Sequence, residues 1–171
     1  LRVAEYSGFL AQALGWKDEE IQNLKYIALL HDIGKVGVPD HVLNKPGKLT
    51  EAEYNIIKSH TTIGGEILKD IETIKHVDSG AKYHHERYDG KGYPCGLCGK
   101  QIPDVARIIG IADAYDAMNS KRIYRENLSP HKIRQELVSG KGTQFDPEYL
   151  EVFLQLFDEG KLVVNKVELD K

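Results

Sequence analysis

Apolar side chains recur every three or four positions along most of this chain, a spacing that places them on one face of a helix. The first such stripe runs from Leu1 to Leu14 and is followed by Gly15. No stretch alternates between apolar and polar positions as a half-buried strand does. Together these patterns predict an all-α fold, with further helical stripes over residues 18–31, 50–60, 63–68, 74–85 and 103–113.

Residue pairs typical of helix starts refine this prediction. Thr50 and Glu53 have the spacing of a capping box, which opens a helix. Two dipeptides place an N-cap residue before a proline suited to the first helical turn, and they predict two more helices, at Ser129-Pro130 and Asp146-Pro147. We therefore expect about seven helices with short connections.

The chain boundaries suggest one domain within a longer protein. The apolar stripe is already under way at Leu1, with neither an initiator methionine nor a capping residue before it, so we expect a fragment that lacks upstream residues. Gly34 stands where the second helix is expected to end. We expect a single domain over residues 1–164, followed by a charged tail at 165–171.

Composition excludes several classes of protein. With 171 residues and a net charge of -3, the chain is long enough for one core and lacks the basic excess of proteins that bind long nucleic acids. Its apolar runs, such as 26–30, are too short to span a bilayer, and no signal peptide is visible. Cys95 and Cys98 form one C-x-x-C pair without a second pair to complete a zinc site, and two cysteines make no disulfide framework. A cytoplasmic location is expected.

Candidate chemistry lies in a scattered set of histidines and aspartates: His31, Asp32, His60, His84, His85 and Asp113. Asp113 falls inside an apolar helical stretch, where a carboxylate needs a cation, a metal or several donors. Imidazole and carboxylate together suit iron, manganese, zinc or nickel, and so many ligands exceed what one ion takes. Each residue alone also has an ordinary structural explanation, and spacing leaves the two readings about equally weighted.

Longer motifs decide between these readings. His31-Asp32-Ile33-Gly34-Lys35 resembles the His-Asp motif of the HD superfamily of metal phosphohydrolases, and residues 84–94, HHERYDGKGYP, resemble the second signature of its HD-GYP subfamily. The resemblance covers nearly the whole chain, with matching segments at 44–50, 113–118, 122–125 and 142–147. Such an ordered set of motifs is far more specific than one His-Asp pair.

The resemblance implies a helical HD-GYP catalytic domain with two or three transition-metal ions, most often iron or manganese. It implies hydrolysis of cyclic di-GMP to pGpG or GMP, or of a related cyclic dinucleotide such as cyclic GMP-AMP. By position, the implied metal ligands are His31, Asp32, His60, His84, His85 and Asp113. The family has a further histidine just before the segment that matches 1–4, so one ligand is expected upstream of Leu1.

Other residues are assigned roles in catalysis and substrate binding. Asp32 is the candidate for a carboxylate that bridges two metals, and Lys35 for contact with a phosphate oxygen. Tyr93 is a candidate for packing on a base. Arg122 and Arg125 are assigned to guanine edges or phosphate by family position, because planar guanidinium groups suit both.

The resemblance also bears on partners. It implies an upstream sensor or receiver domain, a GGDEF-type protein partner and a homodimer as the associations to look for, and it implies no contact of this fragment with a membrane. Two other functions remain open: a broader HD phosphohydrolase acting on another phosphate ester, and a non-catalytic module that binds a nucleotide or a protein.

Overall fold

A computed structural model describes residues 1–120 and 128–164 of the chain. Within these ranges the regular elements are helical and no strand is formed; β-type pairing is limited to isolated bridges, Asp89 with Cys98 and Lys141 with Phe145. The all-α prediction is confirmed. The α-helices are α1 (Arg2–Ala13), α2 (Asp18–Leu30), α3 (Asp40–Leu43), α4 (Glu51–Leu68), α5 (Val77–Tyr83), α6 (Asp104–Asn119), α7 (Pro130–Ser139) and α8 (Pro147–Asp158), with 3-10 turns η1 (Ile33–Gly37) and η2 (Gly99–Gln101).

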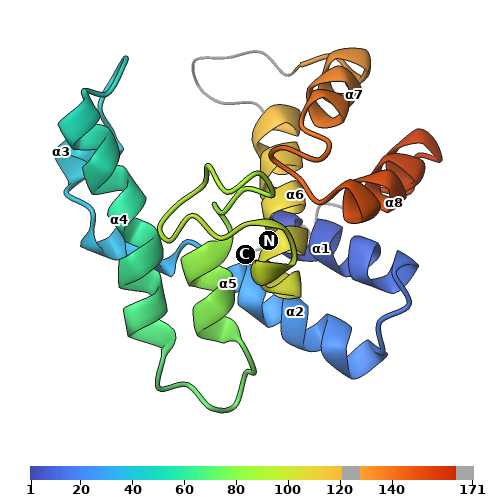
Figure 1. The fold of residues 1–171 in the computed structure, drawn as a ribbon, viewed down its shortest axis with the longest axis horizontal. Helices are drawn as coiled ribbons and strands as arrows, with labels where there is room; N and C mark the ends of the chain where they lie inside the picture. Colours follow the sequence, from blue (N-terminus) through green and yellow to red (C-terminus); the bar gives the residue numbers. More distant parts are fainter. Residues whose placement is uncertain (121–127, 165–171) are drawn as a thin grey trace, which may run out of the picture.

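Helices α2, α5 and α6 form the middle of the molecule (Figure 1). Helix α1 packs on α2, α6 and α8, whereas α5 packs on α2, α4 and α6. Helices α3 and α4 lie on one side and α7 and α8 on the other. The loop between α5 and α6 crosses the space between these two sides.

The core lies where these helices meet. Leu24 and Ile27 of α2, Ala81 of α5, and Ile108 and Ile109 of α6 are all fully buried. Burial of a leucine or isoleucine side chain contributes roughly 1.5–3 kcal/mol to the stability of the fold. The helix faces that carry the apolar stripes therefore turn inward. No helix in the described ranges has the length and apolar character needed to cross a membrane.

The predicted helix starts are confirmed. The Glu53 amide donates to Thr50 Oγ1 at 3.3 Å and the Thr50 amide donates to Glu53 Oε2 at 2.7 Å, which completes the capping box of α4. Ser129 accepts a hydrogen bond from the Lys132 amide at the start of α7, and Asp146 caps α8 through the Glu148 and Tyr149 amides.

The structure corrects three local predictions. Residues 50–60 and 63–68 belong to one continuous helix, α4, and α3 occupies part of the expected loop after Gly34. Gly34 does not end α2, which stops at Leu30. A Cβ at Gly34 would lie 1.9 Å from the His60 carbonyl oxygen, so this glycine allows η1 to lie directly on α4.

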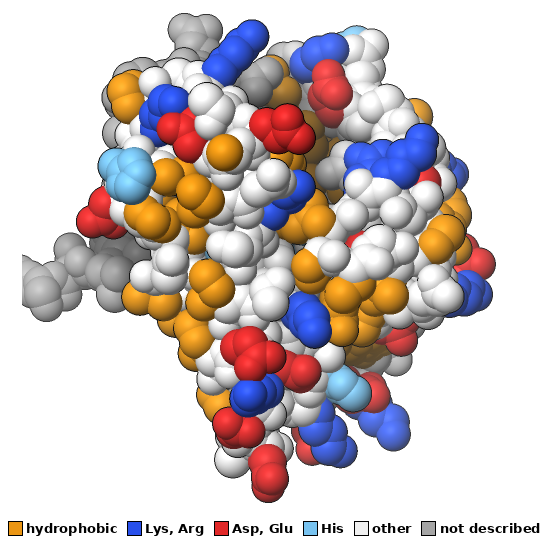
Figure 2. All heavy atoms as spheres, turned by 60° about the vertical axis from the view of Figure 1, so that its left-hand side comes forward, with side chains coloured by type: hydrophobic (Ala, Val, Ile, Leu, Met, Phe, Trp, Pro, Cys, Tyr) orange, Lys and Arg blue, Asp and Glu red, His pale blue; other side chains and the backbone are white. Residues whose placement is uncertain are grey.

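Figure 2 turns the α3–α4 side forward and shows apolar side chains mixed with charged ones on this face. Tyr54, Ile56 and Ile67 of α4 are among the exposed large apolar residues. The opposite face of α4 packs on η1 and α5 and carries His60, whose side chain is buried. Helix α4 therefore presents the polar side chains of His60 and Thr61 to the interior.

Candidate metal centre

His31 lies at the carboxyl end of α2, where one of its ring nitrogens makes a hydrogen bond and the other has no hydrogen-bond partner. Its Nδ1 lies 2.6 Å from the carbonyl oxygen of Ala28. A ring nitrogen that faces a carbonyl oxygen must carry the hydrogen, so Nε2 of the neutral ring carries a lone pair. That Nε2 atom is buried and has no hydrogen-bond partner. A buried electron-pair donor of this kind calls for a cation or a proton.

His60 and His84 are held in the same way. The Nδ1 atoms of these rings lie 2.6 Å from the Ile57 carbonyl oxygen and 2.9 Å from the Ala81 carbonyl oxygen. Their Nε2 atoms are 3.4 Å apart. Because both Nε2 atoms of the neutral rings are acceptors, this approach is not a hydrogen bond and brings two lone pairs face to face.

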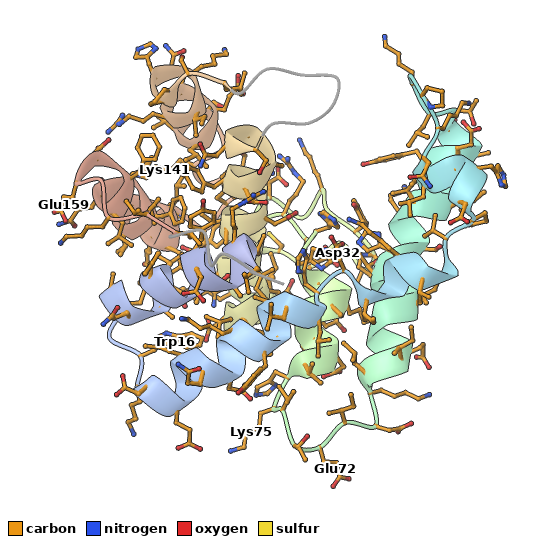
Figure 3. All side chains as sticks on the ribbon, turned by 180° about the vertical axis from the view of Figure 1, so that it is seen from behind. Trp16, Asp32, Glu72, Lys75, Lys141 and Glu159 are labelled. Carbon is orange, nitrogen blue, oxygen red and sulfur yellow. The ribbon has the colours of Figure 1, made fainter. Side chains whose placement is uncertain are left out.

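The Asp32 carboxylate lies among these three nitrogens, where the end of α2 approaches α4 and α5 (Figure 3). Asp32 Oδ2 is 3.4 Å from His31 Nε2. Asp32 Oδ1 is 3.5 Å from His60 Nε2 and 3.9 Å from His84 Nε2. One carboxylate thus directs one oxygen towards His31 and the other towards His60 and His84.

His85 and Asp113 complete the group. The His85 ring centroid lies 4.2 Å from that of His84 and 5.2 Å from that of His60. Asp113, on α6, places Oδ1 3.8 Å from His31 Nε2. The structure therefore brings together the six residues that the sequence analysis singled out, from the ends of α2 and α5 and the interiors of α4 and α6.

Burial and charge set the protonation of this group. Burial lowers the pKa of His60, His84 and His85, that of His85 to about 4. Burial also lowers the pKa of His31, but the nearby carboxylates of Asp113 and Asp32 outweigh it and raise that pKa. Three of the rings are thus neutral at pH 7 and keep a lone pair for a ligand.

These donors fit a metal ion. Two sets have all their ligand atoms within 4.8 Å of one another: His60, His84 and His85, and His31, Asp32 and His84. Two ligand atoms bound at about 2.0–2.2 Å to one ion lie at most about 4.4 Å apart, which accommodates the 3.4 Å to 3.9 Å separations seen around Asp32. Imidazole nitrogen with carboxylate oxygen is a donor set for a divalent transition metal.

Of the other four predicted site residues, two lie beside the cluster and two lie outside the described part of the chain. Lys35, in η1, places Nζ 2.6 Å from Asp32 Oδ2. The Tyr93 ring packs on His85 with a centroid separation of 4.9 Å and lines the pocket beside it. Arg122 and Arg125 lie outside the described residues. The roles assigned to these four side chains stay predictions.

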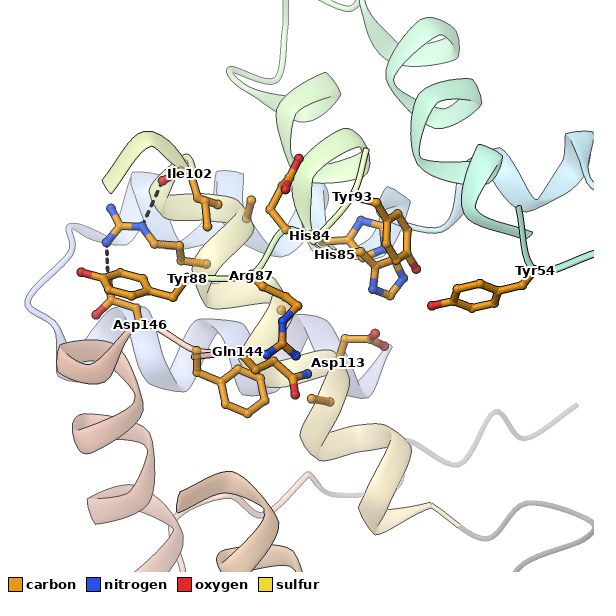
Figure 4. Close-up of a pocket in the computed structure, with 16 residues that line it drawn as sticks. Tyr54, His84, His85, Arg87, Tyr88, Tyr93, Ile102, Asp113, Gln144 and Asp146 are labelled. Atoms are coloured by element: carbon orange, nitrogen blue, oxygen red, sulfur yellow. Dashed lines mark hydrogen bonds and ion pairs between the residues drawn. The ribbon is translucent and has the colours of Figure 1, made fainter. Parts of the chain in front are cut away.

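A pocket of about 330 Å³ opens next to this cluster (Figure 4). His84, His85 and Asp113 belong to both the cluster and the pocket wall. At the far end, Arg107 donates to the Ile102 carbonyl oxygen at 3.0 Å and to Asp146 Oδ2 at 2.5 Å. A ligand held in this pocket would have one end at the candidate metal centre.

The sequence analysis missed Glu86, which organises the loop after α5. This side chain is 7% exposed, and its Oε1 accepts a hydrogen bond from the Cys95 amide at 2.7 Å while Oε2 accepts one from the Leu97 amide at 3.0 Å. Glu86 therefore ties the loop that carries Tyr93 back to the histidine pair. A carboxylate directly after His84-His85 and before a glycine-rich loop was the available signal.

Comparisons with known proteins agree with this geometry. The family model of the HD domain matches residues 1–149. The chain belongs to the HD domain family. A protein from Bdellovibrio bacteriovorus described as an HDG"Y"P protein has the same fold, with a TM-score of 0.73 at 24% identity over 91% of this chain and 50% of that chain. The predicted membership of the HD superfamily is confirmed, and the likeness to this solved structure confirms the fold.

Two curated relatives extend the HD domain comparison. The chain is 42% identical to the cyclic di-GMP phosphodiesterase response regulator RpfG of Xanthomonas campestris pv. campestris, over 90% of this chain and 41% of that protein. It is 40% identical to the 3'3'-cGAMP-specific phosphodiesterase 2 of Vibrio cholerae, over 92% of this chain and 31% of that protein. This HD domain thus spans less than half the length of either relative.

Proposed function

We propose that residues 1–164 act as the catalytic domain of a metal-dependent phosphodiesterase that hydrolyses a cyclic dinucleotide, with cyclic di-GMP as the substrate. The observation that carries this proposal is the convergence of three imidazole Nε2 atoms on the two oxygens of Asp32. Further support is the 42% identity to a cyclic di-GMP phosphodiesterase.

The proposed ligands are His31, Asp32, His60, His84, His85 and Asp113, holding two or three ions of iron or manganese. Asp32 is the proposed bridge, because its Oδ1 and Oδ2 atoms face different imidazoles, His60 and His31. When bound, such ions would polarise the phosphate and lower the pKa of a water nucleophile.

Side chains of the chain itself would orient the substrate. Lys35 is proposed to contact a non-bridging phosphate oxygen, since its ammonium lies beside Asp32 at the edge of the cluster and is half-buried. Tyr93 is proposed to shield the cluster and to pack on a base, because its ring already covers His85. Arg122 and Arg125 keep their proposed contacts with guanine or phosphate on family position alone.

A second candidate substrate is cyclic GMP-AMP. The 40% identity to a 3'3'-cGAMP-specific phosphodiesterase favours it. The regulatory associations also remain proposals that rest on the family resemblance: an upstream sensor or receiver domain, a GGDEF-type partner and a homodimer.

The test is turnover by the purified, manganese- or iron-loaded protein of cyclic di-GMP, 3'3'-cyclic GMP-AMP and bis(p-nitrophenyl) phosphate. We expect cyclic di-GMP to have the highest kcat/KM, with pGpG or GMP as product. A preference for cyclic GMP-AMP would support the second candidate. Hydrolysis of the aryl diester alone would indicate a broader phosphohydrolase, and the absence of any hydrolysis with the metal bound would contradict an enzymatic role.

A further inference from the structure

The pocket next to the candidate metal centre has a size that suits part of a cyclic dinucleotide. Its volume of about 330 Å³ is at the lower end of the roughly 300–1,000 Å³ found for small-molecule sites. Because His85 and Asp113 form its inner end, a phosphodiester at the metal centre would direct one attached nucleoside into the pocket. The side chains on the pocket wall would then contact that base.

Two loops are joined along this wall. The Tyr88 amide donates to the Gln144 carbonyl oxygen at 3.3 Å, and the Asp89 amide donates to the Thr143 carbonyl oxygen at 2.8 Å. These bonds hold the loop after α5 against the loop before α8. As a result, the side chains of Arg87 and Gln144 lie next to each other, facing the space in front of Asp113 (Figure 4).

The Arg87 guanidinium is fixed before any ligand arrives. Its Nε atom donates to Asp89 Oδ1 at 3.1 Å and its Nη2 atom donates to Asp89 Oδ2 at 2.8 Å. Asp89 is itself held by the Lys91 amide, which donates to Oδ1 at 3.1 Å. A guanidinium has five N–H donors, so this pair leaves Nη1 and one hydrogen of Nη2 free for a ligand.

Beside these polar groups, part of the pocket wall is apolar. Phe145, Ile102 and Ala106 line it and are each no more than 5% exposed. The rest of the wall is mostly polar, so a ligand here would meet hydrogen-bonding groups as well as these three apolar side chains.

The donors of Arg87 discriminate between purines. Guanine presents two acceptors, O6 and N7, on one edge, whereas adenine presents the N7 acceptor and the N6 amino donor there. An arginine has no acceptor to offer the adenine amino group. We propose that Arg87, with Gln144 beside it, reads the base of the nucleotide next to the scissile phosphate and selects guanine over adenine. The inference rests on the proposed function for the identity of the ligand.

The test separates base reading from catalysis. GMP and AMP are titrated calorimetrically into the full chain as purified, for wild type and Arg87→Met. We expect wild type to bind GMP about tenfold or more tighter than AMP, the discrimination of one bidentate contact, and Arg87→Met to bring this ratio close to one. Arg87→Lys keeps the charge without the fork of donors, so it should restore GMP affinity only in part.

Arg134→Met is the matched control, because Arg134 makes the same two-bond pair with Asp158 between α7 and α8, at 2.8 Å and 2.9 Å. It should leave the GMP-to-AMP ratio at the wild-type value. Equal affinity of wild type for the two nucleotides, or an unchanged ratio in a folded Arg87→Met variant, would overturn the inference. A GMP preference in a protein that hydrolyses no cyclic dinucleotide would uphold the inference and reject the proposed function.

Discussion

The Nε2 atoms of His60 and His84 face each other at 3.4 Å, and each ring has its Nδ1 atom on a backbone carbonyl oxygen. This arrangement leaves two lone pairs directed at the same point, with Asp32 Oδ1 3.5 Å and 3.9 Å from the two nitrogens. Acceptors packed this closely repel one another unless a cation lies between them. The positions of α4 and α5 are therefore consistent with a site shaped for metal ions.

Removal of either a carboxylate or an imidazole from this group should abolish hydrolysis. We expect Asp32→Ala and His60→Ala each to reduce turnover of cyclic di-GMP to less than a tenth of wild type, because each loses a proposed ligand. The helical circular dichroism spectrum should stay largely unchanged. His41→Ala, an exposed histidine on α3, serves as the control and should retain turnover. Either site variant keeping more than a tenth of the activity would reject its ligand role.

The metal-free protein should lose stability as the pH falls from about 6.5 towards 4. Burial lowers the pKa of His85 to about 4 and that of His84 well below its usual value, whereas in the unfolded chain both titrate near 6.5. Within this window the unfolded chain binds protons that the folded chain does not. The free energy of unfolding therefore falls by about 1.4 kcal/mol per pH unit for each such histidine as the pH is lowered. The raised pKa of His31 acts in the opposite direction, but it does so above about pH 6.5, where the folded chain keeps a proton that the unfolded chain loses.

Urea unfolding of the chelator-treated protein at pH 7, 6 and 5 measures this effect. His85→Gln should flatten the dependence, because it removes one of the groups that titrate. A metal-free protein that is equally stable at pH 7 and pH 5 would show that these rings are not held neutral.

Gly34→Ala should be strongly destabilising. The added Cβ would lie 1.9 Å from the His60 carbonyl oxygen and 2.5 Å from the Gly64 amide nitrogen, so η1 would have to move off α4. We expect a loss of about 1–3 kcal/mol or more in the free energy of unfolding, with lower turnover because Asp32 moves relative to His60. Gly37→Ala is the control: the three atoms nearest to its added Cβ all belong to the Ile63 side chain, at 2.9 Å or more, rather than to backbone. Equal stability of the two variants would contradict the close packing of η1 on α4.

Glu86→Gln should loosen the loop that carries Tyr93. The side-chain amide of glutamine has one acceptor oxygen in place of two, so either the Cys95 or the Leu97 backbone amide would lose its partner. The lost hydrogen bond to a charged group contributes about 1.5–3 kcal/mol to stability. Faster amide hydrogen exchange across residues 93–98 is the expected result. Glu66→Gln, on the exposed part of α4, should leave exchange in this loop unchanged. Unchanged exchange in Glu86→Gln would show that other contacts hold the loop.

The sequence predicted the helices with strong caps or apolar stripes, and it predicted the cluster residues themselves. Thr50, Ser129 and Asp146 cap helices through local bonds, which depend on spacing along the chain alone. The joining of 50–60 and 63–68 into α4 was missed because Gly64 and Gly65, poor helix formers, lie inside the helix against Ala81 and Lys82 of α5. That contact is tertiary and leaves no local pattern.

Spacing could not show which nitrogen of each histidine points inwards. This depends on carbonyl oxygens three residues earlier, such as Ala28 for His31 and Ile57 for His60. The pocket wall was missed for a related reason, since Arg87 and Gln144 meet only through bonds between two loops far apart in the sequence. The family resemblance identified the residues of the cluster, whereas the directions of their side chains become clear only from the fold.

Metal content tests the central claim most directly. The purified protein, with its first helix intact, is loaded anaerobically with iron or manganese, freed of excess ion and analysed for metal per chain by elemental analysis. The convergence of His31, Asp32, His60 and His84, together with His85 and Asp113, predicts at least two ions per chain, and fewer in Asp32→Ala. One ion or none in the wild-type protein would contradict a multinuclear centre.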